Sequence, residues 1–236
     1  MDEIEWWEFD SPAELAEQVA GDMAFVIESA VEAHKSARLA VPSGRDAEPV
    51  YAALLKQKGI DWSAVTLVPT DDAMVGLDDG ESANRRLRGW FEAKGADIVS
   101  LIDEAALGDY QEAGRLADAR LALLQWPLDL VCLTIGENGE VAGICPGPDL
   151  DRALTGPRER RAVGVRPDPA LSGKGDRVSL TAAALSSARA VMIVLSGAEK
   201  KAMLEKAIED GPLSRAPIGR LLAELDVPMD IFWSAN

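Results

Sequence analysis

The chain has 236 residues, with 24 Lys and Arg against 40 Asp and Glu, which gives a formal net charge of −16. This balance argues against nucleic acid or an anionic membrane as a main partner, because both bind a net basic face. Hydrophobic residues make up 47% and charged residues 27%, a composition typical of globular proteins. The acidity is explained by a solvated surface or by adaptation to high salt, and neither explanation indicates which reaction or ligand the protein has.

The first predicted elements are a short strand and a long helix. Polar and apolar residues alternate over Glu3–Trp6, which predicts a half-buried strand. Ser11 then fits an N-cap, Pro12 fits the first helical position and Glu14 completes a capping box. The apolar residues that follow recur at helical spacing, and His34 falls at the C-terminal end of this helix.

Strands and helices alternate through the rest of the chain. Strands are predicted at residues 38–41, 65–69, 98–102, 128–135, 162–165, 178–180, 190–195 and 230–233. Helices are predicted after residue 46, over residues 84–94 and 104–124, and from residue 199. The Pro- and Gly-rich stretch over residues 146–175 is interpreted as a loop-rich excursion within a single domain of residues 1–236. This alternation predicts an α/β fold of three layers, α/β/α, with a modified Rossmann-like, mostly parallel sheet.

The apolar run at residues 128–135 is typical of a central strand buried on both faces. It is also the longest apolar run, and it is too short to span a bilayer. The first nine residues carry acids where a secretory signal would carry bases. We therefore expect a cytoplasmic protein with no membrane partner.

The counts of histidine and cysteine restrict the possible chemistry. His34 is the single histidine, which excludes zinc sites built from several histidines and leaves His34 alone for a Ser-His-Asp triad. It is interpreted as a surface residue near a helix end. Cys132 and Cys145 each lie in an apolar stretch and form no CxxC pair, so a structural role is favoured. No metal site is expected.

Two of the polar loops that follow predicted strands are candidate sites, because ligands bind outside the carboxyl ends of parallel strands. In Ser43-Gly44-Arg45-Asp46, the glycine, the arginine and the next helix N-terminus suit a phosphate. The alternative is an ordinary tight turn with a surface arginine. In Thr70-Asp71-Asp72, adjacent carboxylates can hold sugar hydroxyls, act as a base or bind a cation, or else simply cap a turn.

Two further loops are of the same kind. Gly136-Glu137-Asn138-Gly139-Glu140 follows the most buried strand, but its glycine spacing does not fit a dinucleotide fingerprint. Lys200, after Ser196-Gly197, would lie in the first turn of a helix, where it opposes the helix dipole and would favour a bound anion. A solvent-facing lysine is the alternative. We expect the turns at Gly44 and Gly197 to converge on one anion site.

Together these loops resemble the 6-phosphogluconolactonases, relatives of the glucosamine-6-phosphate deaminases. The resemblance covers nearly the whole chain and rests on motifs in a fixed order. The segments that carry it are Pro42–Ala47 for Gly-Gly-[Ser/Arg]-Thr-Pro, Ile60–Ser63 for I-D-W-S, Thr70–Asp72 and Asn84 for the G-D-E-R and S-N segments, Gly136–Gly147 for G-x-D-G-H-T-A-S-x-F-P-G, Arg177–Thr181 for R-I-T-L-T, and Ser196–Lys200 for [TS]-G-x-x-K. The ending, Ala216–Trp233, is similar to the same family's C-terminal segment.

The departures from these motifs lie at positions to which the resemblance assigns catalysis or phosphate binding. Glu140 stands where the family has the histidine taken as the base, and Asn138 stands at the aspartate two positions earlier. Ala73 replaces the arginine of G-D-E-R, and Asp46 replaces the threonine of the first loop. Asp46 thus adds a negative charge to a loop expected to bind an anion.

The resemblance implies hydrolysis of 6-phospho-D-glucono-1,5-lactone to 6-phosphogluconate, a step of the pentose phosphate pathway, with a small sugar phosphate as the partner and no cofactor. Its site would use Glu140 and Asp71 as catalytic residues. The residues implied to bind the substrate or its phosphate are Gly44, Arg45, Asn84, Gly136, Asn138, Arg177 and Lys200. A non-catalytic sugar-phosphate-binding paralogue is the alternative, because fold likeness alone does not decide function. Aldose–ketose isomerisation with deamination is less expected, because the deaminases also use the missing aspartate and histidine.

Overall fold

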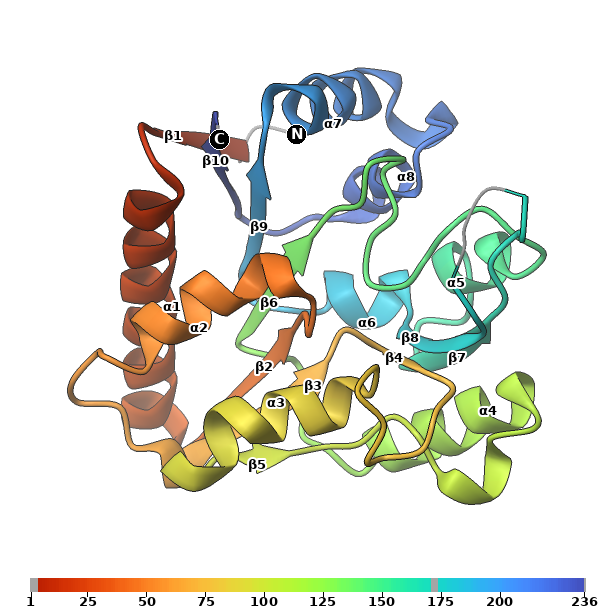
Figure 1. The fold of residues 1–236 in the computed structure, drawn as a ribbon, viewed down its shortest axis with the longest axis horizontal. Helices are drawn as coiled ribbons and strands as arrows, with labels where there is room; N and C mark the ends of the chain where they lie inside the picture. Colours follow the sequence, from red (N-terminus) through yellow and green to blue (C-terminus); the bar gives the residue numbers. More distant parts are fainter. Residues whose placement is uncertain (1–3, 171–173, 236) are drawn as a thin grey trace.

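The computed structural model describes residues 4–170 and 174–235, so that Glu3 of the first predicted strand lies outside the described residues. A seven-stranded sheet forms the centre of the fold, and every neighbouring pair of its strands is parallel. Its strands, in spatial order, are β1 (Ile4–Phe9), β10 (Met229–Ser234), β9 (Val191–Ser196), β6 (Leu130–Thr134), β2 (Ala37–Val41), β3 (Val65–Pro69) and β5 (Asp97–Ile98) (Figure 1).

Helices connect these strands and cover both faces of the sheet. They are α1 (Pro12–His34), α2 (Glu48–Leu54), α3 (Ala83–Phe91), α4 (Tyr110–Leu121), α5 (Leu150–Leu154), α6 (Ala182–Ser186), α7 (Ala198–Asp210) and α8 (Pro217–Glu224). Short 3₁₀ helices lie at Arg45–Ala47, Trp62–Ala64, Glu92–Lys94, Glu104–Ala106 and Gly211–Leu213. Among the helices described, none is long and apolar enough to cross a membrane.

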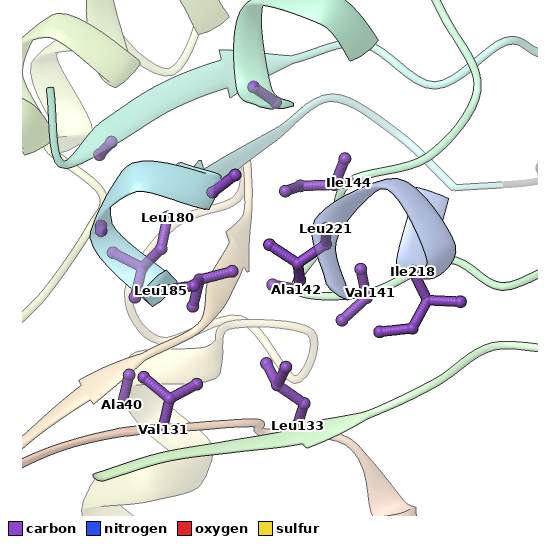
Figure 2. Packing of buried hydrophobic residues seen from close by; sticks show 14 of the residues in the cluster. Ala40, Val131, Leu133, Val141, Ala142, Ile144, Leu180, Leu185, Ile218 and Leu221 are labelled. Atoms are coloured by element: carbon purple, nitrogen blue, oxygen red, sulfur yellow. The ribbon is translucent and has the colours of Figure 1, made fainter. Parts of the chain in front are cut away.

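The three predicted layers are confirmed by the way the central strands divide their side chains. In β6, Leu130 and Cys132 pack with α1, α2 and α3, whereas Val131 and Leu133 pack with α4, α6, α7 and α8 on the opposite face. Figure 2 shows this second face, with Leu133 among the residues packed between the sheet and α8. Because both of its faces are covered, β6 is apolar and buried from Leu130 to Leu133, as its sequence predicted.

The predicted start of α1 is also confirmed. The Ser11 hydroxyl accepts a hydrogen bond from the Glu14 main-chain nitrogen at 3.2 Å, and Pro12 opens the helix. The helix ends at His34, where Lys35 adopts a left-handed conformation with φ of 65°.

A second, three-stranded antiparallel sheet was not predicted. It consists of β4 (Asp71–Ala73), β8 (Arg177–Leu180) and β7 (Ala162–Val165), in the order β4-β8-β7. The segment predicted as a loop at Thr70-Asp71-Asp72 therefore contains a strand. Its hydrogen-bond partners lie about a hundred residues further along the chain, and no local pattern indicates such a pairing.

Two other predicted boundaries were wrong. The strand expected at residues 98–102 is only the two residues of β5, because the chain leaves the sheet edge after Ile98. The helix expected over residues 104–124 is interrupted, because the Asp109 carboxylate accepts hydrogen bonds from the main-chain nitrogens of Gln111 and Glu112 and so caps a new helix, α4.

The topology places one point of the sheet where the direction of winding reverses. From β2 the chain proceeds through β3 to β5 on one side, and then returns to β6 on the other side of β2 before continuing to β9 and β10. In open α/β sheets the carboxyl ends at such a reversal leave a crevice in which ligands bind.

Candidate functional site

A cavity of about 340 Å³ lies at this reversal, over the carboxyl ends of β2, β3 and β6. The described residues that line it include Ser43, Gly44, Asp46, Thr70, Asp71, Glu81, Arg86, Gly136, Glu137, Glu140, Gly143, Lys174, Arg177 and Lys200. Its volume falls within the range of small-molecule sites. Four cations and five carboxylates line it, so charge dominates its chemistry. Among the described residues, two larger hollows of about 670 and 690 Å³ lie beside α6 and beside β5, outside this crevice, and a third of about 450 Å³ lies at the start of α7, where it shares Glu137 and Lys200 with the cavity.

The loop after β2 and the first turn of α7 meet at the cavity. Gly44 and Lys200 both line it, and the Lys200 Nζ lies 3.2 Å from the Asp46 Oδ2. The Tyr51 hydroxyl, buried under the loop, donates a hydrogen bond to the Pro42 carbonyl and so holds the loop to α2. The Gly44 loop and the start of α7 therefore meet, as predicted, and the binding of an anion where they meet stays a prediction.

Gly44 itself is not required by the backbone. Its φ is −70°, a value that any residue adopts, and a Cβ built there would meet nothing within 4 Å. The fold therefore leaves open space beside a main chain that faces the cavity, as an anion approaching the helix start would need.

The loop that carries Glu140 is held through main-chain atoms. The Gly136 nitrogen donates to the Glu140 carbonyl at 2.9 Å, and the Ile218 nitrogen of α8 donates to the Gly139 carbonyl at 3.0 Å. On the far side of the loop, the Ser179 hydroxyl donates to the Ala142 carbonyl at 2.6 Å. Gly139 has φ of 74°, and a Cβ there would lie 2.5 Å from that of Ala216. The glycine is therefore required both by the turn and by its packing.

Glu140 is positioned as a shielded carboxylate with one cationic partner. Its side chain is only 13% exposed, and its Oε2 lies 2.8 Å from the Lys174 Nζ. A Cβ built on Gly136 would come within 3.0 Å of the same oxygen, so the missing side chain at Gly136 makes room for the carboxylate.

Asp71 and Arg177 form a second, more buried ion pair across β4 and β8. The Arg177 Nε donates to the Asp71 Oδ2 at 2.6 Å, and the two side chains are 16% and 17% exposed. The charge of Asp71 raises the pKa of Arg177 above its ordinary value. Gly143 allows the Glu140 loop to pass close by, because a Cβ there would lie 2.8 Å from the Asp71 carboxylate. This pair therefore fixes the floor of the cavity to the small sheet.

Asp72 has a structural role beneath the site. The Asp72 carboxylate is fully buried and accepts hydrogen bonds from the main-chain nitrogens of Ala83 at 2.6 Å and Asn84 at 3.2 Å, which caps α3. Burial raises the pKa of Asp72 from 3.8 to about 6. The adjacent carboxylates predicted at Asp71 and Asp72 thus have different surroundings: one lines the cavity and the other lies inside the fold.

The raised pKa of Asp72 predicts a pH dependence of stability. Between pH 3.8 and about 6 the folded protein holds a proton that the unfolded chain has lost, so the free energy of unfolding falls as the pH rises. Over this pH window, we expect the free energy of unfolding of wild type to fall by about 3 kcal/mol relative to that of Asp72→Asn, which has no proton to lose at this position. Urea unfolding of both proteins from pH 4 to 7 measures the difference. Asp78→Asn, at an exposed carboxylate nearby, should parallel wild type, and parallel curves for Asp72→Asn would contradict the prediction.

The structure brings together six of the nine residues predicted for the site. Those that line the cavity are Glu140, Asp71, Gly44, Gly136, Arg177 and Lys200. The other three do not line it: Arg45 and Asn138 are exposed on their turns, and Asn84 is buried at the start of α3.

Sequence reasoning missed several charged residues of the lining, namely Glu81, Arg86, Glu137 and Lys174. Arg86 was predictable, because it lies in the first turns of α3, where a cation opposes the helix dipole just as Lys200 does in α7. Its Nε donates to the Gly80 carbonyl at 2.9 Å. Lys174 carried no comparable pattern, because it lies in the loop-rich excursion.

The histidine and the two cysteines do not line the cavity. The His34 Nε2 is 3.1 Å from Asp129, a buried residue at the amino end of β6, which is the opposite edge of the sheet. A triad built on His34 at the cavity is therefore excluded. Both thiols are buried, and burial raises the pKa of Cys132 to about 12 and that of Cys145 to about 11, so neither is ionised at neutral pH. Within residues 4–170 and 174–235, no three His, Cys, Asp or Glu side chains are grouped to hold a metal ion.

Comparisons with known proteins identify the family to which the chain belongs. Residues 10–229 match the family described as glucosamine-6-phosphate isomerases/6-phosphogluconolactonase. The chain is 32% identical to a 6-phosphogluconolactonase of Pseudomonas aeruginosa, over 94% of this chain and 92% of the relative, and 28% identical to one of Rhizobium meliloti, over 96% and 97%. The crystal structure of a 6-phosphogluconolactonase from Shewanella baltica superimposes with a TM-score of 0.89 at 27% identity, covering 99% of this chain and 98% of that one. The chain belongs to the glucosamine-6-phosphate isomerase/6-phosphogluconolactonase family.

Proposed function

We propose that the protein hydrolyses 6-phospho-D-glucono-1,5-lactone to 6-phosphogluconate in the cytoplasm, without a cofactor. One observation carries the proposal: a single cavity contains a shielded carboxylate, Glu140, and a cation at a helix start, Lys200, supplied from the ends of two different strands. Hydrolysis of a phosphorylated lactone needs a proton acceptor at one end of the substrate and an anion site at the other. The names of the relatives given above support this assignment.

The phosphate is assigned to the side of the cavity where Gly44 and Lys200 meet. Lys200 supplies a positive charge, the first turn of α7 supplies main-chain nitrogens, and Gly44 leaves open space. Arg177 has the charge for the same role, but its guanidinium already holds Asp71 in place. In this assignment, Arg45 and Asn138 bind the substrate from the rim of the site, because neither lines the cavity.

At the reacting end, the Glu140 carboxylate accepts a proton from a water molecule as that water attacks the lactone carbonyl. The ring C–O bond then breaks, and the ring oxygen takes the proton from Glu140 and leaves as a hydroxyl, which returns Glu140 to its carboxylate form. Lys174 holds the carboxylate in place at 2.8 Å but also occupies part of its capacity to accept hydrogen bonds. A carboxylate is a weaker base than the imidazole found in the family motif.

The alternative function is a non-catalytic protein that binds sugar phosphates. It is favoured by the pairing of charges in the cavity, where Lys174, Arg177 and Lys200 each contact a carboxylate and the one histidine lies at the opposite edge of the sheet. Both functions use the same phosphate site and differ only in what Glu140 does.

The deciding measurement is lactone hydrolysis by the purified protein, corrected for the spontaneous reaction. We expect kcat/KM to lie below that of a family member with the motif histidine, because a weaker base supplies only part of the about 10²–10⁴-fold that general-base assistance contributes. Glu140→His, which restores the imidazole in the same loop, should raise the rate. Turnover equal to that of such a family member in the unaltered protein would contradict the proposed impairment, and no hydrolysis with retained sugar-phosphate binding would support the alternative.

A further inference from the structure

Lys200 is already paired with a carboxylate of the cavity. Its Nζ lies 3.2 Å from the Oδ2 of Asp46, and both side chains line the cavity assigned to the substrate. Asp46 lies in the 3₁₀ turn directly after Gly44, so its carboxylate is held at the point where the open space beside Gly44 meets the start of α7. A ligand phosphate that binds Lys200 must compete with this carboxylate.

The exposure of the two side chains allows the ion pair between Asp46 and Lys200 to separate. Lys200 is 24% exposed and fixed by α7, whereas Asp46 is 64% exposed and can turn into solvent. An exposed ion pair of this kind shifts an equilibrium by about fivefold or less. The pair formed by Asp71 and Arg177 is different, because both of its partners are largely buried and release of either would leave an unpaired charge inside the fold.

From these contacts we infer that Asp46 is a specificity-determining residue, an internal competitor that the phosphate of a ligand displaces from Lys200. The inference rests on the proposed function, because it takes the ligand to be a sugar phosphate. Displacement weakens the binding of phosphorylated ligands in two ways: an existing contact is lost, and a carboxylate remains near a dianion. Ligands that lack the phosphate do not compete for Lys200 and are not affected.

The test compares binding of 6-phosphogluconate and of gluconate to wild type and to Asp46→Asn by calorimetry. We expect the Kd for 6-phosphogluconate to fall about 3- to 10-fold in the variant, the sum of a released ion pair and a removed repulsion. The Kd for gluconate should not change. Glu48→Gln is the matched control, because it removes the same charge from an exposed position near the same loop but outside the cavity lining, and it should change neither value.

A second comparison assigns the gain to Lys200. In a Lys200→Met background, Asp46→Asn should tighten 6-phosphogluconate binding by a smaller factor than it does in wild type, because only the removed repulsion remains. An unchanged Kd in Asp46→Asn, an equal gain in Glu48→Gln, or no binding of 6-phosphogluconate to either wild type or Asp46→Asn would overturn the inference. Absence of lactone hydrolysis alongside tighter binding by Asp46→Asn would leave it standing and would count only against the proposed reaction.

Discussion

Glu140→Gln is expected to reduce lactone hydrolysis to the spontaneous rate, a loss of at least about 10²-fold from whatever turnover the wild type shows. The amide has nearly the shape of the carboxylate but cannot accept the proton of the attacking water. Initial rates of both proteins, after subtraction of the spontaneous reaction, measure the effect.

The same variant separates a working base from a binding pocket. If Glu140 only lines a binding site, Glu140→Gln should bind 6-phosphogluconate as well as wild type or better, because one negative charge near the ligand has been removed. Turnover that is unchanged in the variant would eliminate Glu140 as the base. A urea unfolding curve serves as the control, and it should match wild type because main-chain contacts hold the loop in place.

Gly114→Ala should cost the folded protein more than about 3 kcal/mol or prevent folding. Gly114 lies in the middle of α4, where its main chain packs directly on β7. A Cβ there would lie 2.7 Å from the Val163 carbonyl carbon and 2.9 Å from the Gly164 Cα, and a main chain in a sheet cannot move away as a flexible side chain can.

Gly89→Ala is the matched control for this prediction. Gly89 lies inside α3, and a Cβ there would meet nothing within 4 Å. Alanine in an open helical position should therefore stabilise the protein by about 0.5–1 kcal/mol. Thermal or urea unfolding of the two variants measures opposite changes from the same substitution. Similar small changes in both would contradict the packing argument.

These two glycines illustrate which part of the fold the sequence can predict. Local patterns were sufficient for α1 and for the central strands, because Ser11 caps its own helix and the β6 residues are apolar on both faces. From the sequence alone, Gly114 only lowers the helix propensity of the predicted helix. Its role becomes clear once the structure shows that the main chain of Gly164 packs against it. The small sheet was missed for the same reason, since Asp71–Ala73 becomes a strand only through its distant pairing with β8.

The candidate site was predictable to a similar extent. Strand ends and helix starts are local features, and they led to Gly44, to the loop over residues 136–140 and to Lys200. Glu140 itself was indicated by the family resemblance, and it shares one cavity with Gly44 and Lys200. Pairing between loops is not a local feature. The contact between Asp46 and Lys200 joins residues 154 positions apart, and Lys174 reaches Glu140 from a segment whose sequence predicts only a loop.

The way in which the Glu140 loop is held has an evolutionary consequence. Its ties to α8 and to β8 run through the carbonyls of Gly139 and Ala142, and its turn is closed by main-chain atoms, so none of these contacts uses the side chain at position 140. Selection on folding and selection on chemistry therefore act on different atoms of the same loop. The residue at this position can therefore change between an imidazole and a carboxylate without loss of the contacts that hold the loop, while the activity changes.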